Sequence, residues 1–161
     1  MDITHRYGSH LSDPEKDLIV ARPGRVFVAE DDAEMRAILR FALTRRGYEV
    51  TEAENGAQAL ELLGEILLGL GRRHMAPDLV ITDQCMPGCE GLDLIEALRE
   101  VGVRAPAILI TAFGDPDLVR RATEVGATAV LDKPFDVSLL LAVARRLLAE
   151  GPPPREVGSR G

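Results

Sequence analysis

Short apolar runs alternate along this chain with longer segments that have the spacing of an amphipathic helix. Four of the runs are apolar throughout, as expected of strands covered on both faces: residues 26–29, 79–81, 107–110 and 129–131. Residues 48–53 alternate between apolar and polar side chains instead, which indicates a strand nearer the edge of a sheet. A helical segment follows every predicted strand.

Apolar periodicity and capping residues predict the five helices. In four of them the apolar positions repeat at intervals of three and four residues, which predicts one buried face. These positions are Met35, Ile38, Leu39, Ala42 and Leu43 in the first helix, Leu60, Leu63, Leu67 and Leu70 in the second, Leu94, Ile95, Leu98 and Val101 in the third, and Leu139, Leu140, Val143 and Leu147 in the fifth. Asp115, before Pro116, is expected to cap the fourth helix, which ends near Gly126, and Asp136 the fifth.

Alternating strands and helices predict an α/β fold with a mostly parallel sheet. Right-handed crossovers place helices on both faces of such a sheet, so we expect a doubly wound architecture of five strands and five helices. The segment from residue 64 to 76 is longer than the second crossover requires, and we interpret it as an extended helix or a loop. Ligand sites in this architecture lie beyond the carboxyl ends of the strands.

A length of 161 residues allows one domain with a single core but not two ordinary domains. We interpret residues 25–150 as this domain. The polar residues 1–24, which end in Arg-Pro-Gly, are interpreted as a flexible leader, and residues 151–161, which begin with Gly-Pro-Pro-Pro, as a disordered tail.

The composition argues against several classes of function. The chain has 26 acidic and 19 basic residues and a formal net charge of −7, so its field repels phosphate backbones and we expect no direct nucleic-acid binding. Two cysteines, Cys85 and Cys89, are too few and too close for a disulfide framework, and they match no common zinc pattern. No apolar run approaches the roughly 18 residues of a membrane span. We therefore expect a cytoplasmic protein that does not contact membranes.

Polar residues follow four of the five predicted strands. Because the carboxyl ends of parallel strands meet at one edge of the sheet, we expect these side chains to converge. They are Glu30, Asp31 and Asp32 after the first strand, Thr82 and Asp83 after the third, Thr111 after the fourth, and Asp132 and Lys133 after the fifth. Taken singly, each has a simpler interpretation: the first three as the acidic start of a helix, Asp83 as a turn residue and Lys133 as an exposed charge.

Carboxylates gathered at one edge repel one another, and this repulsion raises their pKa values unless a cation offsets the charge. Oxygen ligands favour a hard divalent ion such as Mg²⁺, or Mn²⁺ in its place, which leaves room for water and a phosphate oxygen. A metal ion and a lysine together are what phosphoryl transfer requires, since the incoming group brings negative charge into an acidic pocket. The residues at the strand ends therefore predict a metal-dependent phosphoryl site.

Four of these strand ends together resemble the signature of response regulator receiver domains, the phosphoacceptor domains of bacterial two-component signalling. The resemblance is carried by Glu30-Asp31, Asp83, Thr111-Ala112 and Lys133-Pro134-Phe135. The turn at residues 83–91 resembles the family's loop after the phosphorylated aspartate, and the similarity covers about residues 25–149. It implies a flavodoxin-like fold with strand order 2-1-3-4-5, as in chemotaxis regulators.

The resemblance assigns roles to these residues. Asp83 resembles the nucleophile that takes a phosphoryl group from a phosphohistidine. Glu30 and Asp31 resemble the acidic pair that holds Mg²⁺, and Asp83 with the backbone carbonyl of Cys85 would complete the protein's ligands. Lys133 resembles the lysine that pairs with the aspartate and then with the phosphoryl oxygens.

Other positions resemble residues that control the signal and its lifetime. Thr111 resembles the hydroxyl that bonds the phosphoryl group and draws the following loop inward, and Pro134 resembles the family's cis proline. Val130 stands where the family often has an aromatic switch residue, which implies output through backbone and loop shifts instead. Cys85 and Phe113 are poor water-orienting side chains, which implies slow loss of the phosphoryl group.

The resemblance implies a signalling domain rather than an enzyme, with a histidine kinase or a histidine phosphotransfer protein as phosphoryl donor. It implies a downstream protein target, reached through the face of the fourth helix, fifth strand and fifth helix, and it leaves a homodimer open. Two other functions stay open: a binding module that keeps a vestigial acidic pocket, and a phosphohydrolase with an aspartyl nucleophile. The second is disfavoured, because such enzymes usually carry another acid where this chain has Cys85.

Overall fold

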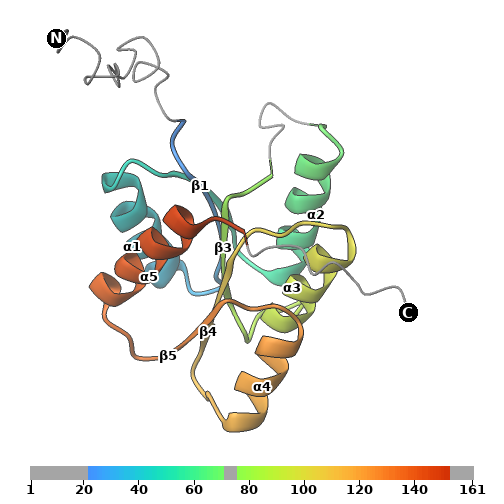
Figure 1. The fold of residues 1–161 in the computed structure, drawn as a ribbon, viewed down its shortest axis with the longest axis vertical. Coiled ribbons are helices and arrows are strands. Elements are labelled where there is room, and N and C mark those ends of the chain that lie inside the picture. Colours follow the sequence, from blue (N-terminus) through green and yellow to red (C-terminus); the bar gives the residue numbers. More distant parts are fainter. Residues whose placement is uncertain (1–21, 71–75, 153–161) are drawn as a thin grey trace, which may run out of the picture.

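The computed structural model describes residues 22–70 and 76–152, and in this part of the chain five strands alternate with five helices (Figure 1). The strands are β1 (Arg25–Ala29), β2 (Glu49–Ala53), β3 (Leu79–Asp83), β4 (Ala107–Thr111) and β5 (Ala129–Asp132). The helices are α1 (Ala33–Arg45), α2 (Gly56–Leu67), α3 (Gly91–Glu100), α4 (Pro116–Glu124) and α5 (Val137–Glu150). None of the helices in these two stretches has the length and apolar character of a membrane span.

Parts of three predicted segments lie outside the described residues. These parts are residues 1–21 of the predicted leader, residues 71–75 of the long connection after α2, and residues 153–161 of the predicted tail. The segment interpreted as an extended helix or a loop is helical as far as Leu67, where α2 ends.

The five strands form one parallel sheet in the order β2-β1-β3-β4-β5, which confirms the predicted doubly wound, flavodoxin-like architecture. β3 lies in the middle, where Ile81 is paired with Val28 of β1 and with Ile108 of β4. Parallel neighbours cannot be joined by a tight hairpin, so each connection between successive strands contains a helix. All five strands therefore end at the same edge of the sheet.

Both faces of the sheet are covered, and successive side chains of one strand enter different cores. Val26 and Val28 of β1 belong to the core beneath α1 and α5. Phe27 and Ala29 belong to the core beneath α2, α3 and α4. Burial on both faces explains why β1 is apolar at successive positions rather than at alternate ones.

Four helices begin with a side chain that accepts a hydrogen bond from a backbone amide of the first turn. Asp115 and Asp136 cap α4 and α5 in this way, with Oδ1 2.7 Å and 2.9 Å from the amide nitrogens, which confirms both predicted caps. Asp32 and Asn55 cap α1 and α2. These caps satisfy amides that the helix itself leaves without partners, so the helices can begin soon after the strands end.

The predicted buried faces of α1, α3 and α5 are wrong at one position each. Ile38 is 46% exposed and Leu139 is 52% exposed, whereas their neighbours Leu39 and Leu140 are buried. Successive residues of a helix point about 100° apart, so at these two positions the neighbouring residue faces the sheet while Ile38 or Leu139 points away from it. Val101 is 64% exposed because it follows the last residue of α3.

The buried face of α2 was predicted incorrectly: of the four leucines expected on it, only Leu63 is buried. Ala59 and Leu63 are buried, while Leu60, Leu67 and Leu70 are 41%, 41% and 67% exposed. Apolar side chains surround much of this helix, so periodicity could not identify the side that meets the sheet. The side of α2 that packs against the sheet carries two small residues, Gly56 and Ala59, which allow the helix to lie close to it.

β5 is less buried than its apolar sequence predicted. Residues 129–131 were expected to be covered on both faces, but they are only half-buried. The strand order places β5 at an edge of the sheet, where it has one neighbouring strand instead of two. β2, whose alternating sequence predicted a strand nearer the edge, lies at the opposite edge.

Two glycines of α2 provide a matched test of how closely this helix approaches the β3–α3 loop. A Cβ at Gly56 would lie 2.2 Å from the backbone oxygen of Cys89, whereas a Cβ at Gly64 would meet no atom within 4 Å. We expect Gly56→Ala to destabilise the fold by about 1–3 kcal/mol, because backbone must move to relieve the contact. We expect Gly64→Ala to stabilise it by roughly 0.5–1 kcal/mol through helix propensity. Denaturant unfolding measures both changes, and equal effects would contradict the close approach.

Candidate functional site

The carboxyl edge of the sheet brings together side chains that are far apart in the sequence. Glu30 follows β1, Asp83 ends β3 and Lys133 follows β5. Lys133 Nζ donates a hydrogen bond to Asp83 Oδ2 at 3.1 Å and lies 3.5 Å from Glu30 Oε2. Among the described residues, Glu30, Asp31 and Asp83 each offer an oxygen within 4.8 Å of the other two. These four residues, the acidic cluster and its lysine, therefore form one local site.

The site has a buried floor and an open side. Glu30, Asp83 and Thr111 are 1%, 5% and 2% exposed. Asp31 is exposed, and Lys133 is half-buried. A group bound between Asp83 and Lys133 would therefore rest on a buried surface and still be reached from solvent.

A backbone hydrogen bond and two ion pairs position Lys133. Its amide donates to the Thr111 carbonyl oxygen at 2.7 Å, and its peptide bond to Pro134 is cis, like the proline in the family that the sequence resembles. Burial lowers the pKa of Lys133, but the hydrogen bond to Asp83 and the negative charge of Glu30 outweigh burial and raise the pKa above its ordinary value. The ammonium therefore stays charged at neutral pH.

Burial raises the pKa of Glu30 to about 7. The amide of Asp32, which donates to Glu30 Oε1 at 3.1 Å, opposes this rise, as does the charge of Lys133, while the negative charge of Asp83 adds to it. The carboxylates at the strand ends were predicted to have raised pKa values because they repel one another. At Glu30 the loss of hydration is the larger cause.

The residues of the acidic cluster fit a hard divalent cation. Glu30 Oε2 is buried and, within residues 22–70 and 76–152, has no hydrogen-bond partner. The Lys133 ammonium, 3.5 Å away, offsets part of the charge on this oxygen, and a bound cation or a proton would stabilise the buried carboxylate further. Glu30, Asp31 and Asp83 supply oxygen ligands only, which is the set that suits Mg²⁺ or Mn²⁺.

Thr111 connects the site to the loop that leads into α4. Its Oγ1 accepts a hydrogen bond from the Phe113 amide at 3.1 Å. The Phe113 side chain is 81% exposed, and Val130 on the neighbouring strand is half-buried against the core beneath α2, α3 and α4. The threonine hydroxyl therefore contacts the backbone at the start of this loop.

Gln84, which no sequence pattern identified, organises the β3–α3 loop. Its Nε2 donates to Glu90 Oε2 at 3.2 Å, its Oε1 accepts from the Leu92 amide at 3.0 Å, and its carbonyl oxygen accepts from the Gly91 amide at 3.0 Å. These bonds close the loop that carries the exposed Cys85. The sequence carried one signal: glutamate is not a preferred N-cap residue, so the first amides of a helix that begins after Glu90 need another partner.

Comparisons with known proteins agree on one family. The family model described as "Response regulator receiver domain" matches residues 26–145. The transcriptional regulatory protein PdtaR of Mycobacterium tuberculosis is 39% identical over 81% of this chain and 60% of PdtaR, so the chain spans less than two thirds of that relative. The chemotaxis protein CheY of Bacillus subtilis is 33% identical over 77% of this chain and 97% of CheY. The solved structure of the chemotaxis response regulator CheY4 of Vibrio cholerae matches with a TM-score of 0.67 and 27% identity, over 78% of this chain and 98% of that one.

The raised pKa of Glu30 predicts a pH dependence of stability in the metal-free protein. Between pH 4.5, the ordinary value, and pH 7, folded Glu30 holds a proton that the unfolded chain releases, so the free energy of unfolding falls as pH rises. We expect this contribution to be on the order of 3 kcal/mol across the window. Glu30→Gln should remove this pH-dependent contribution, because glutamine does not titrate.

Denaturant unfolding of the wild type and of Glu30→Gln in EDTA, at intervals from pH 4.5 to 7, measures the difference. Saturating Mg²⁺ should reduce the wild-type slope, because a bound cation favours the ionised carboxylate. Parallel stability curves for the two proteins in EDTA would contradict the assignment to Glu30.

Proposed function

This chain belongs to the response regulator receiver domain family, and from that premise we propose that Asp83 accepts a phosphoryl group from a histidine kinase or a histidine phosphotransfer protein. The observation that carries the proposal is the contact of Asp83 Oδ2 with the Lys133 ammonium, 3.1 Å away, at a carboxylate that is 5% exposed. A nucleophile of this kind is held in place by its lysine and has one side open to a donor. The proposal assigns the chain a signalling role and no turnover of an external substrate.

The transfer is a displacement at phosphorus. A carboxylate oxygen of Asp83 forms a bond to phosphorus while the bond from phosphorus to the donor's imidazole nitrogen breaks. The phosphohistidine carries a proton on its other ring nitrogen, so the step leaves an acyl phosphate on Asp83 and a neutral imidazole on the donor. The Lys133 ammonium, whose raised pKa keeps it charged well above neutral pH, offsets the charge on the phosphoryl oxygens. The Thr111 hydroxyl accepts from the Phe113 amide and can still donate its own hydrogen to a phosphoryl oxygen.

Glu30, Asp31, Asp83 and the backbone carbonyl of Cys85 would hold Mg²⁺, or Mn²⁺, at this site. The fit rests on the buried Glu30 Oε2, which has no hydrogen-bond partner among the described residues, and on the three carboxylates gathered within 4.8 Å. When bound, the cation supplies positive charge that allows an anionic phosphoryl group to enter an acidic pocket. Gln84 supports this arrangement by holding the loop that carries Cys85.

We place the output on the surface formed by α4, β5 and α5. β5 is the edge strand, and α4 and α5 lie over opposite faces of the sheet beside it (Figure 1). A Thr111 hydroxyl that turns toward a phosphoryl oxygen changes its contact with the Phe113 amide, and with it the start of the loop to α4. Val130 offers no aromatic ring to reorient, so backbone movement carries the change to a protein partner or to a second copy of the chain. The proposed setting is the bacterial cytoplasm.

Phosphorylation by a small donor tests the assignment to Asp83. We expect the purified protein, incubated with acetyl phosphate and Mg²⁺, to gain one phosphoryl group by intact mass and to lose this gain in EDTA. Asp83→Asn should show no gain, because the amide is not a nucleophile. Asp132→Asn, which changes an exposed acid at the same edge of the sheet, is the matched control and should be modified like the wild type.

Equal modification of Asp83→Asn would refute Asp83 as the acceptor. Absence of any modification under saturating donor and Mg²⁺ would favour a binding module with a vestigial pocket. Hydrolysis of a generic phosphatase substrate with multiple turnovers would favour a phosphohydrolase. That function is already disfavoured, because the chain has Cys85 where such enzymes usually carry a second acidic residue.

The residues beside the phosphoryl site predict slow hydrolysis of the acyl phosphate. Cys85 and Phe113 are both exposed, and neither a thiol nor a phenyl ring orients a water molecule well. We expect phosphorylated protein in Mg²⁺ to decay over minutes or longer, and Cys85→Asn, which adds an amide that can bond water, to decay faster. Intact mass measured at intervals after removal of the donor gives the rates. A wild-type lifetime of seconds would contradict this prediction.

A further inference from the structure

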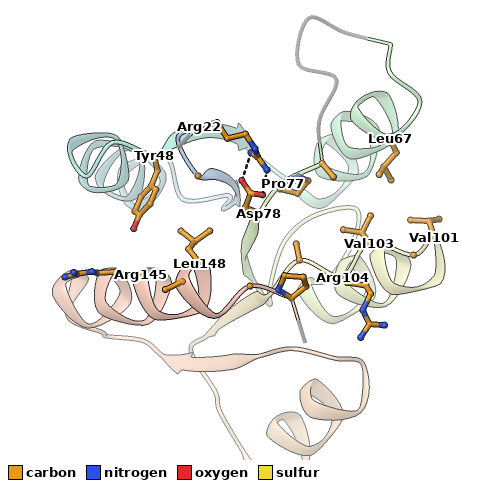
Figure 2. A pocket seen from close by; sticks show the side chains of 17 residues that line it. Arg22, Tyr48, Leu67, Pro77, Asp78, Val101, Val103, Arg104, Arg145 and Leu148 are labelled. Carbon is orange, nitrogen blue, oxygen red and sulfur yellow. Dashed lines mark hydrogen bonds and ion pairs between the residues drawn. The ribbon is translucent and has the colours of Figure 1, made fainter. Parts of the chain in front are cut away.

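A cavity of about 920 Å³ lies at the amino edge of the sheet, away from the acidic cluster (Figure 2). Gly24, just before β1, and Asp78, just before β3, both line it. The acidic cluster lies at the carboxyl ends of the same strands, and a five-residue strand spans roughly 17 Å. The cavity is therefore a second site, separate from the one proposed for phosphorylation.

Apolar side chains form two walls of this cavity. Tyr48 and Leu148 lie on one side of it, and Leu67, Val101 and Val103 lie on the other (Figure 2). Leu67 and Val101 are 41% and 64% exposed. Exposed aliphatic side chains around a hollow indicate a surface that is stabilised when another apolar group covers it.

Arg22 holds the chain at the rim of the cavity. Its guanidinium donates two hydrogen bonds to Asp78, from Nη1 to Oδ2 at 2.9 Å and from Nη2 to Oδ1 at 2.8 Å, and both residues line the cavity (Figure 2). Asp78 Oδ2 also accepts from the Arg25 amide at 2.8 Å. Because the pair is bidentate, it fixes the guanidinium of Arg22 against Asp78. Arg22 therefore lies at the rim of the cavity, and residues 18–20 are joined to it through residue 21 alone.

The sequence before Arg22 complements the cavity. Residues 18–20 are Leu-Ile-Val, three consecutive branched aliphatic residues in a leader whose other branched aliphatic residues, Ile3 and Leu11, stand singly, and Asp17 precedes them. An extended residue spans at most about 3.6 Å, so all three side chains start within about 14 Å of Arg22. Arg104 and Arg145 also line the cavity, and their positive charge favours the approach of Asp17.

The chain that follows Pro152, another residue of the cavity lining, is a poorer match. Residues 153–161 contain two prolines, one branched aliphatic side chain, that of Val157, and two arginines against one acidic residue. The net positive charge of these side chains is repelled by the arginines of the cavity, and the segment has no run of branched aliphatic side chains to bury.

We propose that Leu18-Ile19-Val20 docks in this cavity, between Leu148 at the end of α5 and Val101 beyond the end of α3. The docked segment connects elements that cover opposite faces of the sheet, α5 on one and α3 on the other. Burial of three aliphatic side chains in an apolar hollow stabilises the domain from its amino edge. The proposal does not depend on phosphorylation of Asp83.

Nuclear Overhauser effects in the ¹³C-labelled full chain test the contact directly. We expect cross-peaks between the methyl groups of Leu18, Ile19 and Val20 and those of Val101 and Leu148. Random-coil shifts for residues 18–20 without such cross-peaks would overturn the proposal. So would cross-peaks to the cavity from the tail instead, or cross-peaks seen only between differently labelled copies, which would assign the cavity to a second molecule.

Hydrogen exchange of the full chain provides a second measurement. The Val103 and Gly151 amides, which donate to carbonyl oxygens of Leu98 and Leu147, report on the two ends of the cavity. Replacing all three residues 18–20 with serine should accelerate exchange of both amides at least about tenfold, since burial of three aliphatic side chains exceeds the free energy of a tenfold change.

The matched control replaces Ile3 and Leu11, apolar residues of the leader outside the run, with serine, and it should leave both exchange rates unchanged. Val101→Asp places a charge in the apolar wall of the cavity. Because Val101 is exposed, the domain should still fold, but the cross-peaks from residues 18–20 to Leu148 should weaken. Equal exchange rates in the serine-substituted run, the control and the wild type would overturn the proposal.

Discussion

The parallel pairing of β3 with β1 on one side and with β4 on the other determines where the chemistry of this molecule lies. Strands that run in the same direction end at the same edge, so Glu30 after β1 and Asp83 at the end of β3 become neighbours. Lys133 comes from β5, two strands away from β3, and crosses the end of β4 to reach both carboxylates. Its amide bonds the last carbonyl of β4, at Thr111, which sets the start of that crossing.

The pairing of β1 with β3 also buries the carboxylate of Glu30, away from water. Glu30 is 1% exposed, and burial raises its pKa to about 7, so the metal-free fold carries a group that it would hold more easily in the protonated form. Lys133 relieves part of this cost by contact with Glu30 and Asp83. A site of this kind is less stable alone than with a cation and an anion bound, which is the condition under which a receiver domain is proposed to work.

The two edges of the sheet differ in character for a reason that follows from the crossovers. Each helix begins near the carboxyl edge, so this edge gathers helix amino termini with their partial positive charge and their side-chain caps, such as Asp32 and Asp115. This partial positive charge offsets part of the repulsion between the acidic cluster and an anionic ligand. At the amino edge the helices end, and the cavity is lined by apolar residues and by the Arg22–Asp78 pair. One edge therefore suits phosphoryl chemistry, and the other suits the packing of an apolar segment.

The sequence by itself determined the element types, the parallel sheet and the polar residues that converge, because strand runs, helix caps and strand ends are local patterns. The caps at Asp115 and Asp136 are set by a residue and the amides next to it, and they were predictable for that reason. Only the tertiary structure decided which side of α2 is buried, that β5 is half-covered at an edge, and that Gln84 holds the β3–α3 loop. Each of these depends on a neighbour distant in the sequence, and the protonation of Glu30 likewise depends on burial by surrounding elements that no single segment encodes.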